Sequence, residues 1–302
     1  MSQHPALSRR SFGALSLAAV GSLALSACNS QAQDDSANGG KGKIVIGIVG
    51  ENETNKLFVE LAKKELDLDV EIRNFTEYTQ PNPALENGDI QMNWFQHIAY
   101  LADYNEASGS DLVMIGSTEI IPLPLYSKKY KDVEDFQKGD TVAIPNDTVN
   151  QGRAIGVLVQ AGLVTLKNDT IRPEPKDIDE SASTVKVQPV AAQQTVNALE
   201  SVQGAVINND FSADAGIDTN TALFQDDPSA DAAKPFVNGF VVRQEDKDDE
   251  TYKKLAELYH NQQILDSDAE LSSGTSVPVQ LEQDEIDRVT EDYQAAIAEQ
   301  GS

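Results

Sequence analysis

Two segments of the chain place aromatic rings and polar groups directly after apolar, strand-like runs. Residues 75–85 contain Tyr78, and residues 93–101 contain Trp94, Phe95, His97 and Tyr100. A slot lined by rings with a few polar atoms suits an apolar, polarizable side chain such as a thioether. A second interpretation stays open, in which some of these rings, Trp94 above all, belong to the core.

A guanidinium group follows a third apolar run. Residues 142–144 predict a strand, and a polar segment leads from it to Asn150 and Arg153. We expect Asn150 to be the N-cap of the next helix and Arg153 to lie in its first turn, where free N–H groups favour anions. The forked guanidinium would then hold a carboxylate. The alternative is an ion pair between Arg153 and an acidic neighbour of this acidic chain.

A pair of amides ends a fourth apolar run. Asn208 and Asn209 follow residues 204–207, which predict a strand. The side chain of Asn208 could bridge the ammonium and carboxylate groups of a small ligand. The alternative is an ordinary turn-forming Asn pair.

The elements that would position these residues alternate between strands and helices. Apolar runs predict strands at 43–50, 70–74, 90–95 and 112–115, and helical spacing predicts helices at 54–66, from residue 83, and at 98–104. Thr54 is the expected N-cap of the first helix. This β-α-β-α order implies an α/β fold with a mostly parallel sheet covered by helices.

Pro122 and Pro124 mark the expected crossing into a second α/β unit. That unit has predicted strands at 141–144, 184–188 and 204–207 and predicted helices at 151–161 and 193–199. A strand at 236–243 would cross back, followed by helices at 249–266 and 283–299. We expect lobe 1 to comprise 43–121 and 236–302, lobe 2 to comprise 122–235, and the ligand cleft to lie between the lobes.

The N-terminal segment reads as an export signal with a lipid attachment site. Arg9 and Arg10 precede an uncharged apolar run at 12–27, so residues 1–27 are predicted to be a signal peptide. The paired arginines leave general secretion and twin-arginine export both open. Leu25-Ser26-Ala27-Cys28 matches a lipobox, which makes Cys28 the expected lipid attachment residue; the alternative is a stray buried cysteine. Residues 28–42 would form a lipidated, flexible tether.

Composition excludes several classes of function. The 302 residues carry 23 Lys and Arg against 49 Asp and Glu, a formal net charge of −26, which would repel nucleic acid. The single cysteine excludes an intramolecular disulfide and a cysteine-based metal site. The chain has no HExxH, P-loop or GxSxG motif. We therefore expect no enzyme, no cofactor and no metal.

Four segments together resemble the methionine-binding lipoproteins of ABC importers, the MetQ/NlpA lipoprotein family. They are 75–85, 95–101, 145–153 and 205–208, and residues 126–129 and 235–238 also match. The resemblance implies a two-lobed, type II periplasmic-binding-protein-like fold with methionine in the interlobe cleft. It also implies three kinds of partner: L- or D-methionine, an ABC permease with its ATPase subunits, and the outer face of the cell membrane through acyl chains such as palmitate.

The resemblance also assigns roles to particular residues. Tyr78, Phe95, His97 and Tyr100 would surround the ligand side chain, Arg153 would bind its carboxylate, and Asn150 and Asn208 would complete recognition of its backbone groups. One departure concerns Ile121-Pro122, because many relatives have Glu-Pro there, whereas here the nearest acid is Glu119. That change keeps open an alternative ligand, a methionine-containing dipeptide or another small zwitterion.

Overall fold

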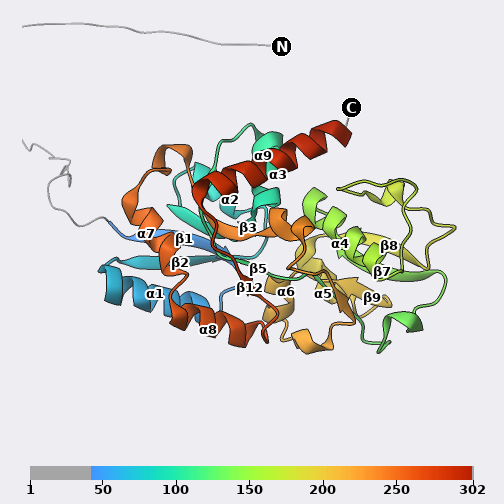
Figure 1. Ribbon diagram of the computed structural model, residues 1–302. Coiled ribbons are helices and arrows are strands. Elements are labelled where there is room, and N and C mark those ends of the chain that lie inside the picture. The colour runs from blue at the N-terminus through green and yellow to red at the C-terminus, as the bar shows by residue number, and fades with distance from the viewer. Residues whose placement is uncertain (1–41, 301–302) are drawn as a thin grey trace, which may run out of the picture. The chain divides into compact units, whose positions relative to one another are not determined.

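Two five-stranded sheets organise the chain. Figure 1 shows how helices lie around their strands. The computed structural model describes residues 42–300. The predicted signal peptide, Cys28 and all of the predicted tether except Gly42 therefore lie outside the described residues.

The first sheet is mostly parallel. Its strand order is β2 (Val70–Phe75), β1 (Ile44–Val49), β3 (Met92–His97), β11 (Asn238–Val242) and β4 (Val113–Ser117). The returning strand β11 runs antiparallel to both of its neighbours. Because β11 separates β3 from β4, a segment far along the sequence completes the centre of this sheet.

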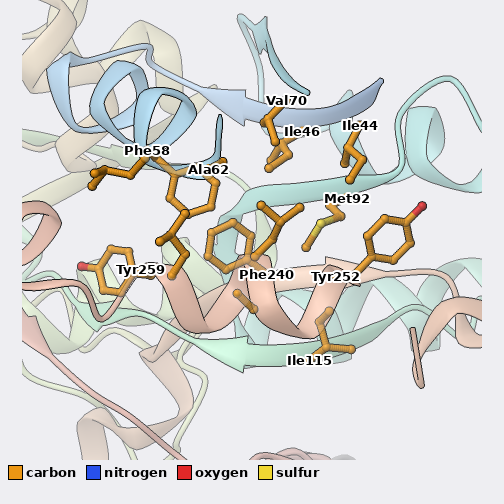
Figure 2. Close-up of a cluster of buried hydrophobic side chains, with 14 of the residues drawn as sticks. Ile44, Ile46, Phe58, Ala62, Val70, Met92, Ile115, Phe240, Tyr252 and Tyr259 are labelled. Atoms are coloured by element: carbon orange, nitrogen blue, oxygen red, sulfur yellow. The ribbon is translucent and has the colours of Figure 1, made fainter. Parts of the chain in front are cut away.

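Helices cover both faces of the first sheet. On one face, Phe58, Leu255 and Ile264 pack against Ile46 and other strand residues, as Figure 2 shows for part of this cluster. These helical residues come from α1 (Glu53–Leu66), α7 (Glu250–Leu258) and α8 (Gln262–Leu271). The opposite face is covered by α2 (Pro81–Glu86), α3 (Ile98–Ser108) and α9 (Gln283–Gln300). Strands buried on both faces explain the nearly continuous apolar run of β1.

The second sheet has the same construction. Its strand order is β10 (Phe224–Gln225), β6 (Pro124–Tyr126), β9 (Gly204–Val206), β7 (Asp140–Pro145) and β8 (Val185–Val190). One face packs against α4 (Thr148–Gln160), and the other against α5 (Thr195–Ala198) and α6 (Asn209–Asp214). A two-stranded antiparallel ribbon, β5 (Glu119–Ile120) with β12 (Val277–Pro278), lies outside both sheets.

Two short segments connect the sheets. Residues 118–123 lead from β4 to β6, and residues 226–237 lead from β10 back to β11. The predicted crossing near Pro122 falls in the first segment, while the predicted lobe boundaries stay a prediction. Among the residues that the structure describes, no helix is long and apolar enough to cross a membrane.

The first helix begins earlier than the sequence predicts. The N-cap is Asn52, not Thr54, because Asn52 and Asn55 exchange hydrogen bonds between side chains and backbone N–H groups in a capping box. Thr54 is buried in the first turn, where its hydroxyl lies 2.9 Å from that of Ser267. Its polar atom therefore joins α1 to α8 instead of ending a helix.

The helix predicted at 249–266 is wrong as a single element. The structure divides it into α7 and α8, because Asn261 adopts an extended conformation and its side chain accepts a hydrogen bond from the N–H of Gln263. Both halves have apolar residues at helical spacing, so periodicity alone does not reveal the break. The break turns the chain and brings α8 beside α1.

Phe240 is the residue whose loss should weaken the first sheet most directly. Its ring is fully buried, 4.9 Å from Trp94 and 5.4 Å from Phe58 between ring centroids. Replacing it by Ala should lower the free energy of unfolding by about 3–5 kcal/mol, because a cavity replaces the ring. Urea unfolding followed by circular dichroism measures this loss. A loss below about 1 kcal/mol would contradict the central place of this ring in the core.

Candidate functional site

One cavity of about 110 Å³ collects all seven residues that the sequence singled out for ligand binding. It lies where β1 and β3 of the first sheet end, opposite α4 and the residues after β9. The predicted residues in its lining are Tyr78, Phe95, His97, Tyr100, Asn150, Arg153 and Asn208. Ends of adjacent strands thus bring together residues that are far apart in sequence, as expected for an open α/β sheet.

Three aromatic residues form one side of the cavity, here called the ring wall: Tyr78, Phe95 and Tyr100. Their ring centroids lie 5.9–6.1 Å apart, within the range of favourable aromatic contacts. The Tyr100 hydroxyl donates to the backbone carbonyl of Tyr78 at 3.2 Å, which fixes the orientation of the Tyr100 ring, and the Tyr78 hydroxyl donates to Asp210 at 2.7 Å. The ring wall is therefore a rigid apolar surface.

Trp94 belongs both to the core and to the cavity. Its ring lies 4.9 Å from that of Phe240 and 5.6 Å from that of Tyr259, and it also contributes to the cavity lining. Successive residues of a strand point to opposite faces, so Trp94 and Phe95 leave β3 on different sides. Core packing thus holds Trp94 in place at the edge of the cavity.

His97 presents a neutral imidazole to the cavity. It is the N-cap of α3, and its Nδ1 accepts a hydrogen bond from the Tyr100 N–H at 3.1 Å. Burial, assisted by the charge of Arg153, lowers the pKa of His97 to about 3, so the ring is uncharged near pH 7. Because Nδ1 accepts, the proton sits on Nε2, which is buried without a hydrogen-bond partner among the described residues.

The predicted cap of α4 is wrong by three residues. Asp147 is the N-cap, and its carboxylate accepts from both the backbone N–H and the side-chain amide of Asn150 at 2.9 Å. Asn150 is therefore released from capping and turns its amide toward the cavity. Burial raises the pKa of Asp147, while the hydrogen bonds from Asn150 oppose that shift.

A chain of amides continues from Asn150 to Asn208. The amide nitrogen of Asn208 donates to Oδ1 of Asn150 at 3.0 Å. This leaves Oδ1 of Asn208 buried with no hydrogen-bond partner in the described part of the chain. A buried, unpaired acceptor costs free energy, so an incoming donor would be favoured at this atom.

Arg153 lies in the second turn of α4, because the helix begins at Thr148 and not at Gln151. Its Nε and Nη2 donate to the carboxylate of Asp226 at 2.7 and 3.2 Å, and Nη2 also donates to the carbonyl of Ile121 at 2.8 Å. The guanidinium carbon lies 4.3 Å from the centre of the Phe236 ring. The ion pair between Arg153 and an acidic neighbour, which the sequence left open as an alternative, is therefore present.

The ion pair leaves part of the guanidinium available. Both side chains are nearly buried, with 6% of Arg153 and 10% of Asp226 exposed. Within residues 42–300, Nη1 of Arg153 donates to no other residue, and Arg153 lines the cavity. Asp226 thus orients a guanidinium that still has donors for an anion.

Three acids that were not among the predicted site residues also line the cavity: Glu119, which is buried, and Asp210 and Asp268, which are partly buried. The Tyr78 hydroxyl donates to Asp210 at 2.7 Å, and burial raises the pKa of Asp210 to about 7. In a chain with 49 acids, no sequence signal distinguishes these three. Asn238, which also lines the cavity, lies in a segment that the resemblance does include.

The cavity offers binding groups rather than a metal centre. In the described portion, no cluster of three or more His, Cys, Asp or Glu residues is arranged to hold a metal ion. The arrangement combines an apolar ring wall, an oriented guanidinium, a neutral N–H donor and unpaired oxygen acceptors. Such a set can bind a small molecule that has an apolar part and both anionic and cationic ends.

Comparisons with known proteins agree with this description. The NlpA lipoprotein family matches residues 44–280. The D-methionine-binding lipoprotein MetQ of Salmonella typhi is 33% identical over 264 residues, which cover 86% of this chain and 94% of that protein. The substrate binding protein of a methionine transporter from Streptococcus pneumoniae is 32% identical, with a TM-score of 0.72 over 78% of this chain and 95% of that one.

A third relative was solved with its ligand. The nutrient binding protein from Burkholderia cenocepacia bound to methionine is 31% identical, with a TM-score of 0.73 over 78% of this chain and 99% of that one. The predicted α/β, two-lobed periplasmic-binding fold is confirmed by this structural similarity. The chain belongs to the NlpA lipoprotein family, as its four spaced segments predict.

Proposed function

We propose that this protein captures methionine in the cavity and delivers it to an ABC importer as its lipid-anchored substrate-binding protein. One observation carries the proposal: a single cavity contains both the ring wall and the oriented guanidinium of Arg153. Relatives that are named for methionine binding support the same ligand. Capture and release involve no covalent chemistry, so the protein acts as a binding protein and not as an enzyme.

The ring wall suits the thioether of methionine. Sulfur packs favourably against aromatic rings at about 5 Å, and Tyr78, Phe95 and Tyr100 offer such faces. Burying an apolar side chain of this size contributes about 1.5–3 kcal/mol. The side chain alone therefore cannot give a micromolar affinity, which requires about 8 kcal/mol.

Two donors suit the carboxylate. Nη1 of Arg153 is uncommitted, and the Nε2–H of His97 is buried and unpaired among the described residues. A charge-assisted hydrogen bond contributes about 1.5–3 kcal/mol, so two such contacts supply a large part of the remaining free energy. Because His97 stays neutral above about pH 3, this donor persists across the physiological range.

Asn208 suits the backbone nitrogen of the ligand. Its buried Oδ1 lacks a partner in the described region and is oriented by Asn150. An ammonium group that donates to this oxygen would satisfy an acceptor that otherwise stays desolvated. Asn150 therefore acts as a positioning residue for Asn208.

Contacts between the two predicted lobes support binding by lobe closure. The Tyr78 hydroxyl, beyond the end of β2, donates to Asp210 on α6. Arg172 forms an ion pair with Asp103 on α3 at 2.5 Å. If lobe 1 comprises 43–121 and 236–302 and lobe 2 comprises 122–235, both contacts join the two lobes. Ligand that touches both lobes would favour the closed arrangement over an open one.

The partners follow from the family. A substrate-binding protein of an ABC importer delivers its ligand to a membrane permease that is driven by ATPase subunits. A lipid on Cys28 would hold the protein at the outer face of the cell membrane, and residues 28–42 would act as a tether that lets the folded domain extend away from the membrane. Two or more acyl chains anchor a protein stably where one is marginal.

Removing the guanidinium should abolish methionine binding. Arg153→Ala is combined with Asp226→Asn so that no buried carboxylate is left without its cation. We expect isothermal titration calorimetry to show affinity at least about 100-fold weaker than that of the natural protein, because the carboxylate loses its charged partner.

Asp226→Asn alone is the matched control, since it retains Arg153 and the acceptor for the Leu123 N–H. Its affinity should stay at least about tenfold above that of the double variant, because the guanidinium is retained. Equal methionine affinity in the double variant and the control would refute the carboxylate role of Arg153. A thermal-shift panel of amino acids and methionine-containing dipeptides decides the ligand, because a dipeptide that stabilises more strongly than methionine would favour the alternative.

The lipid anchor has a separate test. Cys28→Ser removes the only thiol of the chain and with it the expected attachment point. We expect the variant to leave the membrane fraction after cell fractionation, while its methionine affinity stays unchanged because residue 28 precedes the folded body. A variant that stays in the membrane fraction after alkaline carbonate washing would contradict anchoring through Cys28.

A further inference from the structure

Glu119 is a buried carboxyl group at the cavity that forms no salt bridge within residues 42–300. It lies in the short strand β5, only 5% of the residue is exposed, and it lines the cavity. Its Oε2 is buried and has no hydrogen-bond partner within the described chain. Hydrogen bonds from Tyr259 and Thr118 favour its charged form, but burial and the charge of Asp268 oppose it. A buried carboxylate without a cation is costly, so the group must either hold a proton or receive a cation.

Asp268 stands beside Glu119 and also lines the cavity. Its Oδ2 accepts from the hydroxyls of Tyr259 at 3.2 Å and Ser276 at 2.9 Å, so hydrogen bonds fix its orientation. Glu119 and Asp268, here called the acid pair, come from β5 and α8. These elements are separated by more than half of the folded sequence and meet only at the cavity.

The described residues supply no cation to the acid pair. The salt bridges of residues 42–300 include neither member, and the salt bridge of Arg153 is to Asp226. The other titratable groups that face Glu119 are Asp210 and the Tyr259 hydroxyl, neither of which is cationic. The nearby His260 directs its Nε2 to the Ser117 carbonyl. A cation that pairs with Glu119 and Asp268 must therefore be supplied by a ligand.

We propose that the acid pair is the subsite for the ammonium group of the bound amino acid. The assignment rests on the proposed function, because it needs a zwitterion whose carboxylate occupies Arg153. The ammonium would donate to Glu119 and Asp268 from the side of the cavity, with Oδ1 of Asn208 as a further acceptor. A ligand without a protonated amine would leave the acid pair unpaired and would be rejected.

Binding of the ammonium group at the acid pair should be coupled to the release of a proton. Burial, together with the charge of Asp268, raises the pKa of Glu119 to about 8, and burial raises the pKa of Asp268. The empty site therefore holds a proton at neutral pH, and an arriving ammonium displaces it into solvent. The total charge at the acid pair stays balanced. Since a proton must leave below about pH 8, methionine affinity should rise as the pH increases from about 6 to 8.

The test compares methionine with its des-amino analogue, 4-(methylsulfanyl)butanoate, which keeps the thioether and the carboxylate. The natural protein, Glu119→Gln and Asp268→Asn are titrated with both compounds, and Glu257→Gln on the exposed side of α7 is the matched control. We expect the natural protein and the control to prefer methionine by at least about 100-fold. Each acid-pair variant should reduce this preference at least about tenfold.

Calorimetry in buffers of different ionisation enthalpy gives a second readout that needs no variant. The natural protein should release part of a proton per methionine bound at pH 7, and the Glu119→Gln protein should release less than half as much. An unchanged preference in both variants, or no proton release by the natural protein, would overturn the assignment while methionine binding stands. If the natural protein binds no methionine at all, the proposed function fails and this assignment fails with it.

Discussion

The buried ion pair between Arg153 and Asp226 is the interaction on which the site depends. Arg153 contacts Ile121 in the first connection between the sheets, and Asp226 and Phe236 in the second. One side chain on α4 therefore joins both connections and also lines the cavity. A guanidinium without Asp226 would be an unpaired buried charge, which costs several kcal/mol. The same contact thus stabilises a buried binding charge and links the site to both segments that connect the sheets.

The positions of the strands along the chain, and the convergence of the candidate residues on one cavity, were largely predictable, because buried parallel strands are continuous apolar runs and their polar continuations meet at one edge. The residues at which the helices begin were not predictable. At α1 and at α4 two residues that are able to cap lie within three positions of each other, Asn52 and Thr54 in one case, Asp147 and Asn150 in the other. Which one caps is decided by what the other contacts: Ser267 for Thr54, and Asn208 for Asn150.

The acids of the cavity were unpredictable for a different reason. Aromatic residues are scarce in this chain, so their grouping near strand ends carries information, whereas acidic residues are everywhere. Glu119 is set apart only by burial, and burial follows from the pairing of β5 with β12 far along the chain. Its relation to Asp268 further requires the break at Asn261, which aims α8 at the cavity and which periodicity conceals. Long-range geometry, not residue type, gives these side chains their significance.

The charges of the cavity explain why a zwitterion is favoured over a simple anion or cation. Arg153 is balanced by Asp226, His97 is neutral, and burial raises the pKa of Glu119 to about 8 and that of Asp210 to about 7. The charges at the cavity are therefore largely paired or reduced by protonation, although the chain carries a net charge of −26. A ligand with a net charge would add an uncompensated charge to a buried site, whose cost rises steeply in a low dielectric. A zwitterion brings no net charge of its own, and its two ends meet donors and acceptors that are already in place.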